Sequence, residues 1–449
     1  MSLQYKIYSD LEDFENSGLL NHQSLQLNLR GSSKNRLGFK LQQLSSSLKK
    51  CKNLKNLDAD LSANYINGKN LPQLTSALKE LQSIIFLRLD LNCNHLVFGD
   101  LEGLSNSIAS LKNLATLVLN LSQNKIGSQD MHSLDCIFKN CKNICNLDLN
   151  FRLNKIQSDG IQFLCSSLKQ CFNLTNLAVN FSSNQISQDC GESFKDLAQC
   201  KSLTNLMIDL NFNKICDKEI NQLADGLACC NKLSGLSLDL SNTKMSKSAN
   251  YLGFALKSLE LIKFQLILRD RTDSNKLYNL SICFPEFKKL ENLNLCFASQ
   301  NVIDDHSMQQ FSLALPKIQN LRVLNVDFSL NLISPNSAIQ FAKALEGCRD
   351  LQQLTLSFMY VRIQSQGVLR LFQSFTLCKK LTSLNLNIGD NYAKPEDLTE
   401  LVTEIKKFQK FQVIAIQSIS KEFFKDLQTT QKFIRNTMKL KKLVKCLVW

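Results

Sequence analysis

The sequence has little of what most enzyme sites depend on. Glycine accounts for 15 of the 449 residues, and neither a Walker loop nor a Gly-x-Gly-x-x-Gly motif occurs, which excludes the usual phosphate-binding loops. The four histidines fall at unrelated places in the chain: His22, His95, His132 and His306. This scatter indicates no Ser/His/Asp triad and no metal-ligand set. We therefore expect no catalytic activity, no cofactor and no small-molecule ligand.

Long apolar runs and a secretory leader pattern are also absent. No stretch of about 18 apolar residues occurs, which predicts no membrane span. Residues 1–10 lack the basic-then-apolar pattern of a signal peptide. We expect a cytoplasmic, reducing location, with the cytoskeleton, a cilium or the nucleus as alternatives.

One pattern instead repeats along most of the chain. Between Cys141 and Ile156, a cysteine is followed by apolar residues at offsets +3, +6, +8 and +10, by asparagine at +13 and by isoleucine at +15. The same offsets return from Cys171 and from Cys200. Successive units begin at residues 51, 81, 111, 141, 171, 200, 230, 258, 287, 318, 348, 378 and 408, with a mean spacing close to 30 residues.

Each unit combines two hydrophobic periods. The alternation of Leu147, Leu149 and Phe151 predicts a strand with one buried face. The later spacing of Ile161, Leu164 and Leu168 predicts a helix with one apolar stripe. A single strand and helix cannot bury both apolar faces alone, so stacked units are expected to form a parallel sheet covered by helices.

The repeated pattern resembles a known family. Leu-x-x-Leu-x-Leu-x-Leu-x-x-Asn-x-Ile followed by a helix resembles the leucine-rich repeat, in its ribonuclease-inhibitor-like class, about thirteen times over roughly residues 20–420. The resemblance implies an α/β solenoid, a horseshoe with a parallel sheet on its concave face and helices on its convex face. It also implies that the asparagine at +13 bonds to turn backbone of its own and neighbouring repeats. The added x-Leu step before this asparagine predicts strands slightly longer than the family norm.

The cysteines follow the repeat rather than a disulfide pattern. Of the 17 cysteines, seven occupy the first position of a unit: Cys51, Cys141, Cys171, Cys200, Cys230, Cys348 and Cys378. A residue type restricted to one repeat position is used for its size and apolar character. We predict reduced, buried thiols rather than disulfides or zinc ligands.

The chain is predicted to have three parts. Residues 1–50 form an N-terminal cap and a first degenerate repeat, because a solenoid end must cover its last apolar layer. Residues 51–420 form the solenoid. It is irregular at about 269–316, through either a bend, loop or binding site, or simple sequence drift. Residues 421–449 form a basic amphipathic helix, which is either a C-terminal cap or a docking element.

One exposed position of the predicted strands is strongly patterned. Offset +9 lies between buried +8 and +10, so it faces the concave side, and nine of its twelve residues are Asp or Asn. They either form a ladder of hydrogen bonds between stacked strands or an acidic, amide-rich surface for a basic or polar protein. The candidate partner-binding residues here are Asp60, Asp90, Asn120, Asn150, Asn180, Asp209, Asp239 and Asp327.

The net charge of +14 is concentrated at the C-terminus. Residues 401–449 contain eleven Lys or Arg against three Asp or Glu. Candidate partner-binding residues there are Lys432, Arg435, Lys439, Lys441, Lys442 and Lys445. We expect an interaction scaffold or a structural subunit of a larger assembly that binds other proteins. The alternatives are association with nucleic acid or an acidic filament through the basic C-terminus and, third, regulation of a GTPase, because one GTPase-activating family shares this class of repeat.

Overall fold

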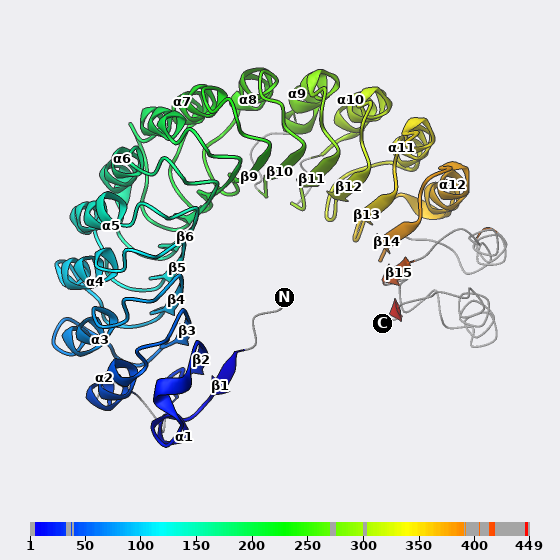
Figure 1. Cartoon of the computed structure of the whole chain (residues 1–449). Coiled ribbons are helices and arrows are strands. Elements are labelled where there is room, and N and C mark those ends of the chain that lie inside the picture. Colours follow the sequence, from blue (N-terminus) through cyan, green and yellow to red (C-terminus); the bar gives the residue numbers. More distant parts are fainter. Residues whose placement is uncertain are drawn as a thin grey trace. The chain divides into compact units, whose positions relative to one another are not determined.

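The structure, a computed structural model, describes residues 5–32, 37, 40–269, 275–299, 303–389, 391 and 404, and the backbone alone at 413–417 and 445–447. The chain divides into two compact units, Met1–Leu233 and Ser234–Trp449. In both units short parallel strands alternate with helices in chain order (Figure 1). The α/β class and the repeated, solenoid-like architecture are therefore confirmed.

The first unit contains eight strands, and neighbours along the chain pair in parallel. The strands are β1 Lys6–Tyr8, β2 Ser24–Asn28, β3 Asn56–Asp60, β4 Phe86–Asp90, β5 Thr116–Asn120, β6 Asn146–Asn150, β7 Asn176–Asn180 and β8 Asn205–Asp209. The helices between them are α1 Leu11–Glu15, η1 Leu19–Asn21, α2 Leu41–Lys50, α3 Leu71–Leu78, α4 Asp100–Ala109, η3 Ser128–Leu134, α5 Asp135–Asn140, α6 Gln157–Leu168, η4 Gly191–Gln199 and α7 Asp217–Ala228.

The second unit repeats this arrangement. Its strands are β9 Gly235–Asp239, β10 Lys263–Ile267, β11 Asn292–Cys296, β12 Val323–Asp327, β13 Gln353–Ser357, β14 Ser383–Asn387, β15 Val413–Gln417 and β16 Lys445–Leu447. Its helices are α8 Ser248–Leu256, α9 Lys276–Cys283, η5 Phe284–Glu286, α10 Asp305–Ala314, η6 Leu315–Lys317, α11 Pro335–Gly347 and α12 Gln364–Leu377.

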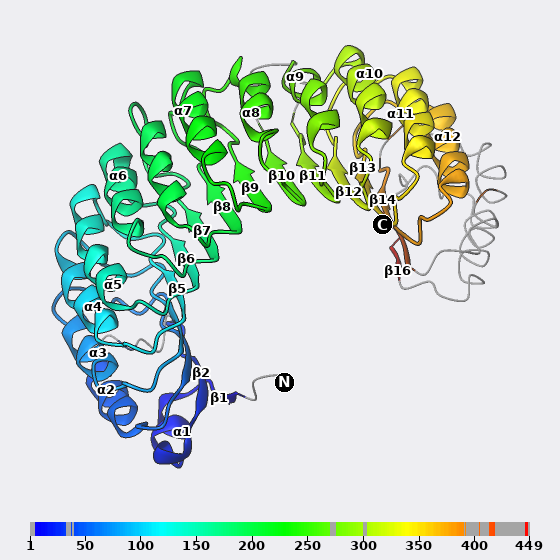
Figure 2. The ribbon, with the colours of Figure 1, turned by 45° about the horizontal axis from the view of Figure 1, so that its top comes forward.

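Within each unit the strands form one layer and the helices a second layer against it (Figure 2). The core lies between the layers. Leu147 and Leu149 of β6, and Ile161, Leu164 and Leu168 of α6, are all at most 2% exposed, as the two hydrophobic periods predict. Each such side chain contributes about 2 kcal/mol by leaving water. A repeat therefore gains most of its stability only when both layers are in place.

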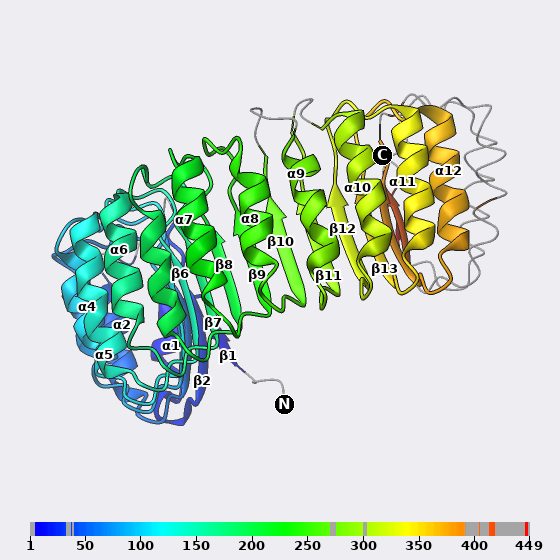
Figure 3. The ribbon, with the colours of Figure 1, turned by 90° about the horizontal axis from the view of Figure 1, so that it is seen from above.

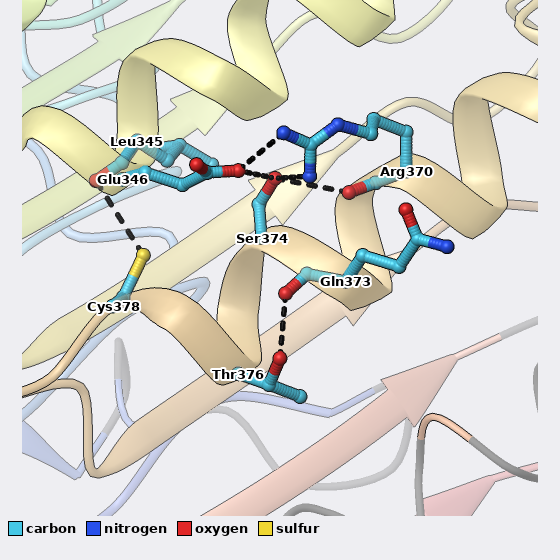
Figure 4. A network of polar contacts seen from close by, with 7 residues as sticks. All are labelled: Leu345, Glu346, Arg370, Gln373, Ser374, Thr376 and Cys378. Carbon is cyan, nitrogen blue, oxygen red and sulfur yellow. Dashed lines mark hydrogen bonds and ion pairs between the residues drawn. The ribbon is translucent and has the colours of Figure 1, made fainter.

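Polar side chains also tie neighbouring helices together. In the second unit, where α11 and α12 lie side by side (Figure 3), Arg370 of α12 forms an ion pair with Glu346 of α11 at 2.5 Å. Ser374 donates to the same carboxylate at 2.9 Å and accepts from Arg370 at 3.0 Å (Figure 4). At the end of α12, the Cys378 thiol donates to the carbonyl of Leu345.

The asparagine at +13 pairs the buried backbone of two repeats at once. The Asn154 amide donates to Phe151 O in its own repeat at 3.0 Å and to Leu121 O in the preceding one at 2.9 Å. Its Oδ1 accepts from the N–H of Ile126 at 3.0 Å. Buried main-chain groups need such partners. Equivalent bonds are made by Asn94, Asn124, Asn184, Asn213, Asn331 and Asn391, which confirms the structural role predicted for this position.

The residue at offset +12, which precedes this asparagine or the Thr243 or Val361 that replaces it, lies in the left-handed region although it is not glycine. Its φ lies between 52° and 64° at Ala63, Cys93, Gln123, Leu153, Ser183, Phe212, Asn242, Leu330 and Tyr360. This conformation costs a side-chain-bearing residue about 1 kcal/mol. Main-chain bonds between repeats continue through it, since Leu153 N donates to Ser182 O at 3.0 Å. The pairing thus extends past the five-residue strands, in line with the extra step in the repeat.

The ends and the irregular region complete the fold. At the N-terminus β1 pairs with β2, and α1 buries Leu11 and Phe14.

Across the irregular region, β10, β11 and β12 pair in unbroken register, with residues 270–274 and 300–302 outside the described part. At the C-terminus, Lys445–Leu447 form β16 beside β15, so the predicted helix over 421–449 is wrong for these three residues. Residues 421–444 lie outside the described part.

The seven cysteines at the first position of a unit are buried and free, as predicted. Several of the thiols donate to carbonyls near the ends of helices: Cys141 Sγ lies 3.3 Å from Ile108 O of α4, and Cys200 Sγ lies 3.3 Å from Leu168 O of α6. Burial raises the pKa of Cys141 to about 11 and that of Cys171 to about 12. Protonated thiols of this kind act as small apolar side chains.

We predict that Asn154→Ala lowers the free energy of unfolding by about 3 kcal/mol, because several buried backbone groups lose their partner. Asn154→Thr should cost less, because Thr243 holds the same position in its own repeat and donates to Leu240 O at 2.8 Å. Asn143→Ala is the control, since this exposed amide makes one bond, to Lys112 O. Urea unfolding measures all three. Equal losses for Asn154→Ala and Asn143→Ala would contradict the role of the +13 amide.

We predict that a short pulse of iodoacetamide on the folded protein labels the exposed Cys93 and Cys229 first. Cys141 and Cys171 should stay unlabelled until denaturant is added, because they are buried and their pKa values are raised. Peptide mapping by mass spectrometry reads out each site. Labelling of Cys171 as fast as that of Cys93 would show that the repeat core is open.

Candidate functional site: the exposed sheet face

Three columns of side chains cover the exposed face of the sheet in the first unit. They come from offsets +5, +7 and +9 of each repeat, while +6 and +8 point into the core. In β3 these are Asn56, Asp58 and Asp60. The paired strands keep one register, so each column runs straight across β3 to β8.

The +9 column bonds mainly to its own turns. Asp60 Oδ1 accepts from the backbone N–H of Ser62 at 3.0 Å and from its hydroxyl at 2.6 Å. The same bond to the backbone N–H two residues later is made by Asp90, Asn120, Asn150, Asn180, Asp209, Asp239 and Asp327. Asn120 also donates to Asp90 across the strands at 2.9 Å. The Asp/Asn pattern therefore serves the turn that ends each strand, and its bonds run chiefly within a repeat rather than between repeats as the ladder interpretation supposed.

The ladder between strands occurs at the +5 column instead. Asn146 donates to the Thr116 hydroxyl at 3.1 Å, Asn176 donates to Asn146, and Asn205 donates to Asn176 at 2.7 Å. Each amide thus bonds to its counterpart on the preceding strand. The sequence analysis did not identify this column, although the asparagines that recur at offset +5 could have indicated it.

The +7 column, in the middle of the face, has no common residue type. From β2 to β8 it reads Gln26, Asp58, Arg88, Val118, Asp148, Ala178 and Met207. Asp58 and Arg88 approach to 3.7 Å, and Met207 is 50% exposed. Because the other two columns cap the turns and form the ladder, the fold does not require one residue type at offset +7. Without a recurring residue type, the sequence offers no signal for this column.

Asp148 is an exposed carboxylate at the centre of the +7 column. It has no hydrogen bond or ion pair with any described residue, and its cross-strand neighbours are Val118 and Ala178, which offer no side-chain donor. The surrounding sheet partly removes its water, which raises its pKa, while the positive charge of Arg88 opposes that effect. The ionised group thus costs the fold free energy.

The face of the first unit is acidic. Its three columns hold five carboxylates against Arg88 alone: Asp58, Asp60, Asp90, Asp148 and Asp209. Burial raises the pKa of Asp58, the adjacent Arg88 lowers it, and the charges of Asp60 and Asp90 raise it further. In the second unit the same columns of β9 to β14 hold Asp239 and Asp327 against Lys263. The negative charge is therefore concentrated on the first unit.

No protein-family model matches this sequence, and no curated protein matches it significantly. The architecture and the geometry of the sheet face are thus the basis for a functional proposal.

The +9 column is interrupted in the second unit, where Ile267 and Cys296 replace Asp or Asn. Arg269 fills the gap, with Nε 3.0 Å from Cys296 Sγ. That contact, with the nearby charges of Asp239 and Asp327, raises the pKa of Arg269. The guanidinium thus stabilises a stretch of the sheet that lacks its usual capping side chain.

The remaining candidates are placed as follows. All four histidines stack on or pack against rings: His95 on Tyr65, His132 on Phe163, His306 on Tyr278, and His22 on Tyr8 and Phe14. His22 also bonds to Ser17 in the N-terminal cap. In the part of the chain that the structure describes, no three His, Cys, Asp or Glu side chains are grouped to hold a metal ion, and no helix has the length and apolar character to cross a membrane. Lys445 lies in β16, where only the backbone is described. The other C-terminal candidates lie outside the described residues: Lys432, Arg435, Lys439, Lys441 and Lys442.

We predict that Asp148→Asn raises the urea midpoint of unfolding at pH 7. The folded-state pKa of Asp148 lies above its ordinary value of 3.8, so the ionised form is penalised only in the folded protein. The penalty is complete above the folded-state pKa and disappears below 3.8, so the gain should shrink as the pH falls towards 4. Glu102→Gln, on the exposed surface of α4, is the control. A gain that grew with falling pH would contradict the raised pKa.

Proposed function

We propose that this protein is a leucine-rich-repeat scaffold that binds a protein partner through the exposed sheet face of its first unit. The family assignment is supported by about thirteen copies of the repeat pattern and by the +13 asparagine, whose amide bonds inside the turn. The architecture supports it as well, since parallel strands and helices alternate throughout the described residues.

One observation supports the binding face above all. Asp148 is an exposed carboxylate that forms no hydrogen bond or ion pair with any described residue, and its cross-strand neighbours Val118 and Ala178 offer no donor. Only the charge of Arg88, two strands away, opposes its partial loss of water. A positive group from another molecule would supply a direct interaction, and polar groups that the fold does not use are typical of functional sites.

The surroundings of Asp148 indicate the kind of partner. Val118 and Ala178 beside it are small, and Met207 follows on β8 with half of its surface exposed. A lysine or arginine side chain could lay its aliphatic part over Ala178 and Met207 and place its charge at Asp148. A methionine adapts its shape to such a contact. We therefore propose a basic protein surface as the partner, within a multi-subunit assembly.

The proposed compartment follows from the thiols. Free cysteines such as Cys93 and Cys229 are exposed, and the described residues contain no disulfide. This pattern is typical of proteins kept in a reducing compartment. We propose the cytoplasm or a structure within it.

We predict that Asp148→Lys combined with Met207→Glu abolishes capture of the protein partner, because the new lysine repels a basic surface and the apolar contact is lost. The experiment is a native pull-down of the tagged protein, with and without nuclease, washed across a salt series and identified by mass spectrometry. Glu102→Lys combined with Val97→Ala is the control, because both side chains are exposed and lie off the sheet face. Circular dichroism checks that both variants fold.

The outcomes separate the proposed functions. Partners that survive nuclease and moderate salt, and are lost with the sheet-face variant alone, support the proposal. Partners that disappear with nuclease would instead favour nucleic acid as the ligand. Partners retained by the sheet-face variant would exclude this face as the binding site.

A further inference from the structure

Three of the cations on one edge of the first unit's sheet have partners inside the fold. Where the strands begin, Lys52 forms an ion pair with Glu80 at 3.0 Å. Lys112 donates to Ala109 O at the end of α4 at 3.1 Å, and Lys142 donates to Phe138 O of α5 at 3.3 Å. Carbonyls at the C-terminal ends of helices favour cations. These three charges are therefore explained by the fold, while Lys55 and Lys201 on the same edge are exposed and have no side-chain partner among the described residues.

The opposite edge, where the strands end, differs. Its exposed cations include Lys125, Arg152, Lys155 and Lys214. Their side chains form no ion pair or hydrogen bond with any described residue, so their charge is not used within the fold. They occupy offsets +11 and +14 of the repeats that begin at residues 111, 141 and 200.

Two large apolar side chains lie among these cations. Leu153 is 42% exposed and Phe212 is 62% exposed, and both hold the left-handed +12 position with φ of 57° and 54°. Asparagine occupies this position at Asn242 and suits the left-handed conformation better. Leu153 and Phe212 thus lower the stability of the fold in two ways, through a left-handed backbone conformation and through exposure of an apolar side chain to water. We call Lys125, Arg152, Leu153, Lys155, Phe212 and Lys214 the turn-edge patch.

The backbone of the patch is already paired, so recognition there depends on side chains. The N–H groups of Lys125, Lys155 and Lys214 donate to Leu96 O, Ile126 O and Ile186 O, at 2.9, 2.8 and 2.7 Å. Each of these bonds ties a patch turn to the turn of the preceding repeat, and the repeat that begins at residue 171 separates Lys155 from Lys214. A phosphate group would find none of these three N–H groups free, and Phe212 is the one aromatic ring of the patch available for base stacking. Both facts favour a protein ligand over nucleic acid.

We propose that the turn-edge patch binds an acidic segment of a partner protein that also carries a large apolar side chain. Carboxylates of the segment pair with the four cations, and its apolar residue covers Leu153 and Phe212. Side chains that combine a charge and an apolar contact in this way are typical of interface hot spots. This surface is separate from the sheet face, which is acidic and fits a basic partner. The protein would thus hold two partners of opposite charge.

The test uses a fluorescent synthetic peptide of alternating glutamate and phenylalanine, with fluorescence anisotropy as the readout. We expect the full-length protein to bind this peptide, and not a matched peptide with lysine in place of glutamate. Neutralising the patch by Lys125→Gln, Arg152→Gln, Lys155→Gln and Lys214→Gln should weaken binding about tenfold or more and reduce its salt dependence. The control variant removes the same charge elsewhere on the exposed surface, by Lys50→Gln, Lys79→Gln, Lys195→Gln and Lys201→Gln, and should bind as the unchanged protein does.

A second variant tests the apolar part. Phe212→Asn suits the left-handed turn, so it should fold at least as well as the unchanged protein while losing most of the peptide affinity. An oligo-dT strand and vesicles of phosphatidylcholine with phosphatidylserine serve as competing ligands. Peptide binding that neither the patch variant nor Phe212→Asn reduces would overturn the proposal. So would patch-dependent binding of oligo-dT or vesicles in place of the peptide. The sheet-face variant with Asp148→Lys should still bind the acidic peptide, so failure here and failure of the proposed function are distinguishable.

Discussion

The fold depends on how the buried turn after each strand pairs its backbone. Main-chain groups taken out of water need partners, and the asparagine at +13 supplies them to its own repeat and to the preceding one, as Asn154 does for Phe151 O, Leu121 O and Ile126 N. A repeat without its neighbour would leave these groups unpaired. Stacking is thus required at the level of the backbone, and the apolar layers of strands and helices add their burial to an arrangement already held in register.

On the exposed face of the first unit, the three columns of side chains have different roles. Offset +9 caps the turns through bonds such as Asp60 to Ser62, and offset +5 joins strands through the amides of Asn146, Asn176 and Asn205. A structural role of this kind requires the same residue type at every repeat. The +7 column neither caps the turns nor joins the strands, and its residue types differ from strand to strand. A binding surface on a repetitive scaffold needs this freedom, because a uniform surface cannot distinguish one partner from another.

The charged side chains likewise divide into those that bond within the fold and those that do not. Where strands begin, Lys52, Lys112 and Lys142 are paired with a carboxylate or helix ends, whereas the four cations of the turn-edge patch have no partner among the described residues. The face between the two edges is acidic. A net charge of +14 therefore says little about the partner by itself. Opposite charges lie on separate surfaces of one unit, so a basic and an acidic ligand could bind without competing.

The sequence alone determined the repeat length, the strand and the helix in each unit, the parallel sheet and the buried thiols. These follow from hydrophobic periods and from residue types that recur at fixed offsets, which are local properties of the chain. The role of the +13 asparagine came from the resemblance of the repeat to the leucine-rich repeat. The tertiary structure decided which atoms the exposed polar side chains meet. Asp60 accepts a hydrogen bond in its own turn, and Asn146 donates one to the neighbouring strand. Asp148 and Lys155 form no side-chain hydrogen bond or ion pair with any described residue. The tertiary structure also placed Lys445–Leu447 in a strand, although the local pattern favoured a helix. The bond from Asn146 to Thr116 and the pairing of β16 with β15 depend on groups about thirty residues away, which only stacking brings within hydrogen-bonding distance, whereas the bond of Asp60 lies within its own turn.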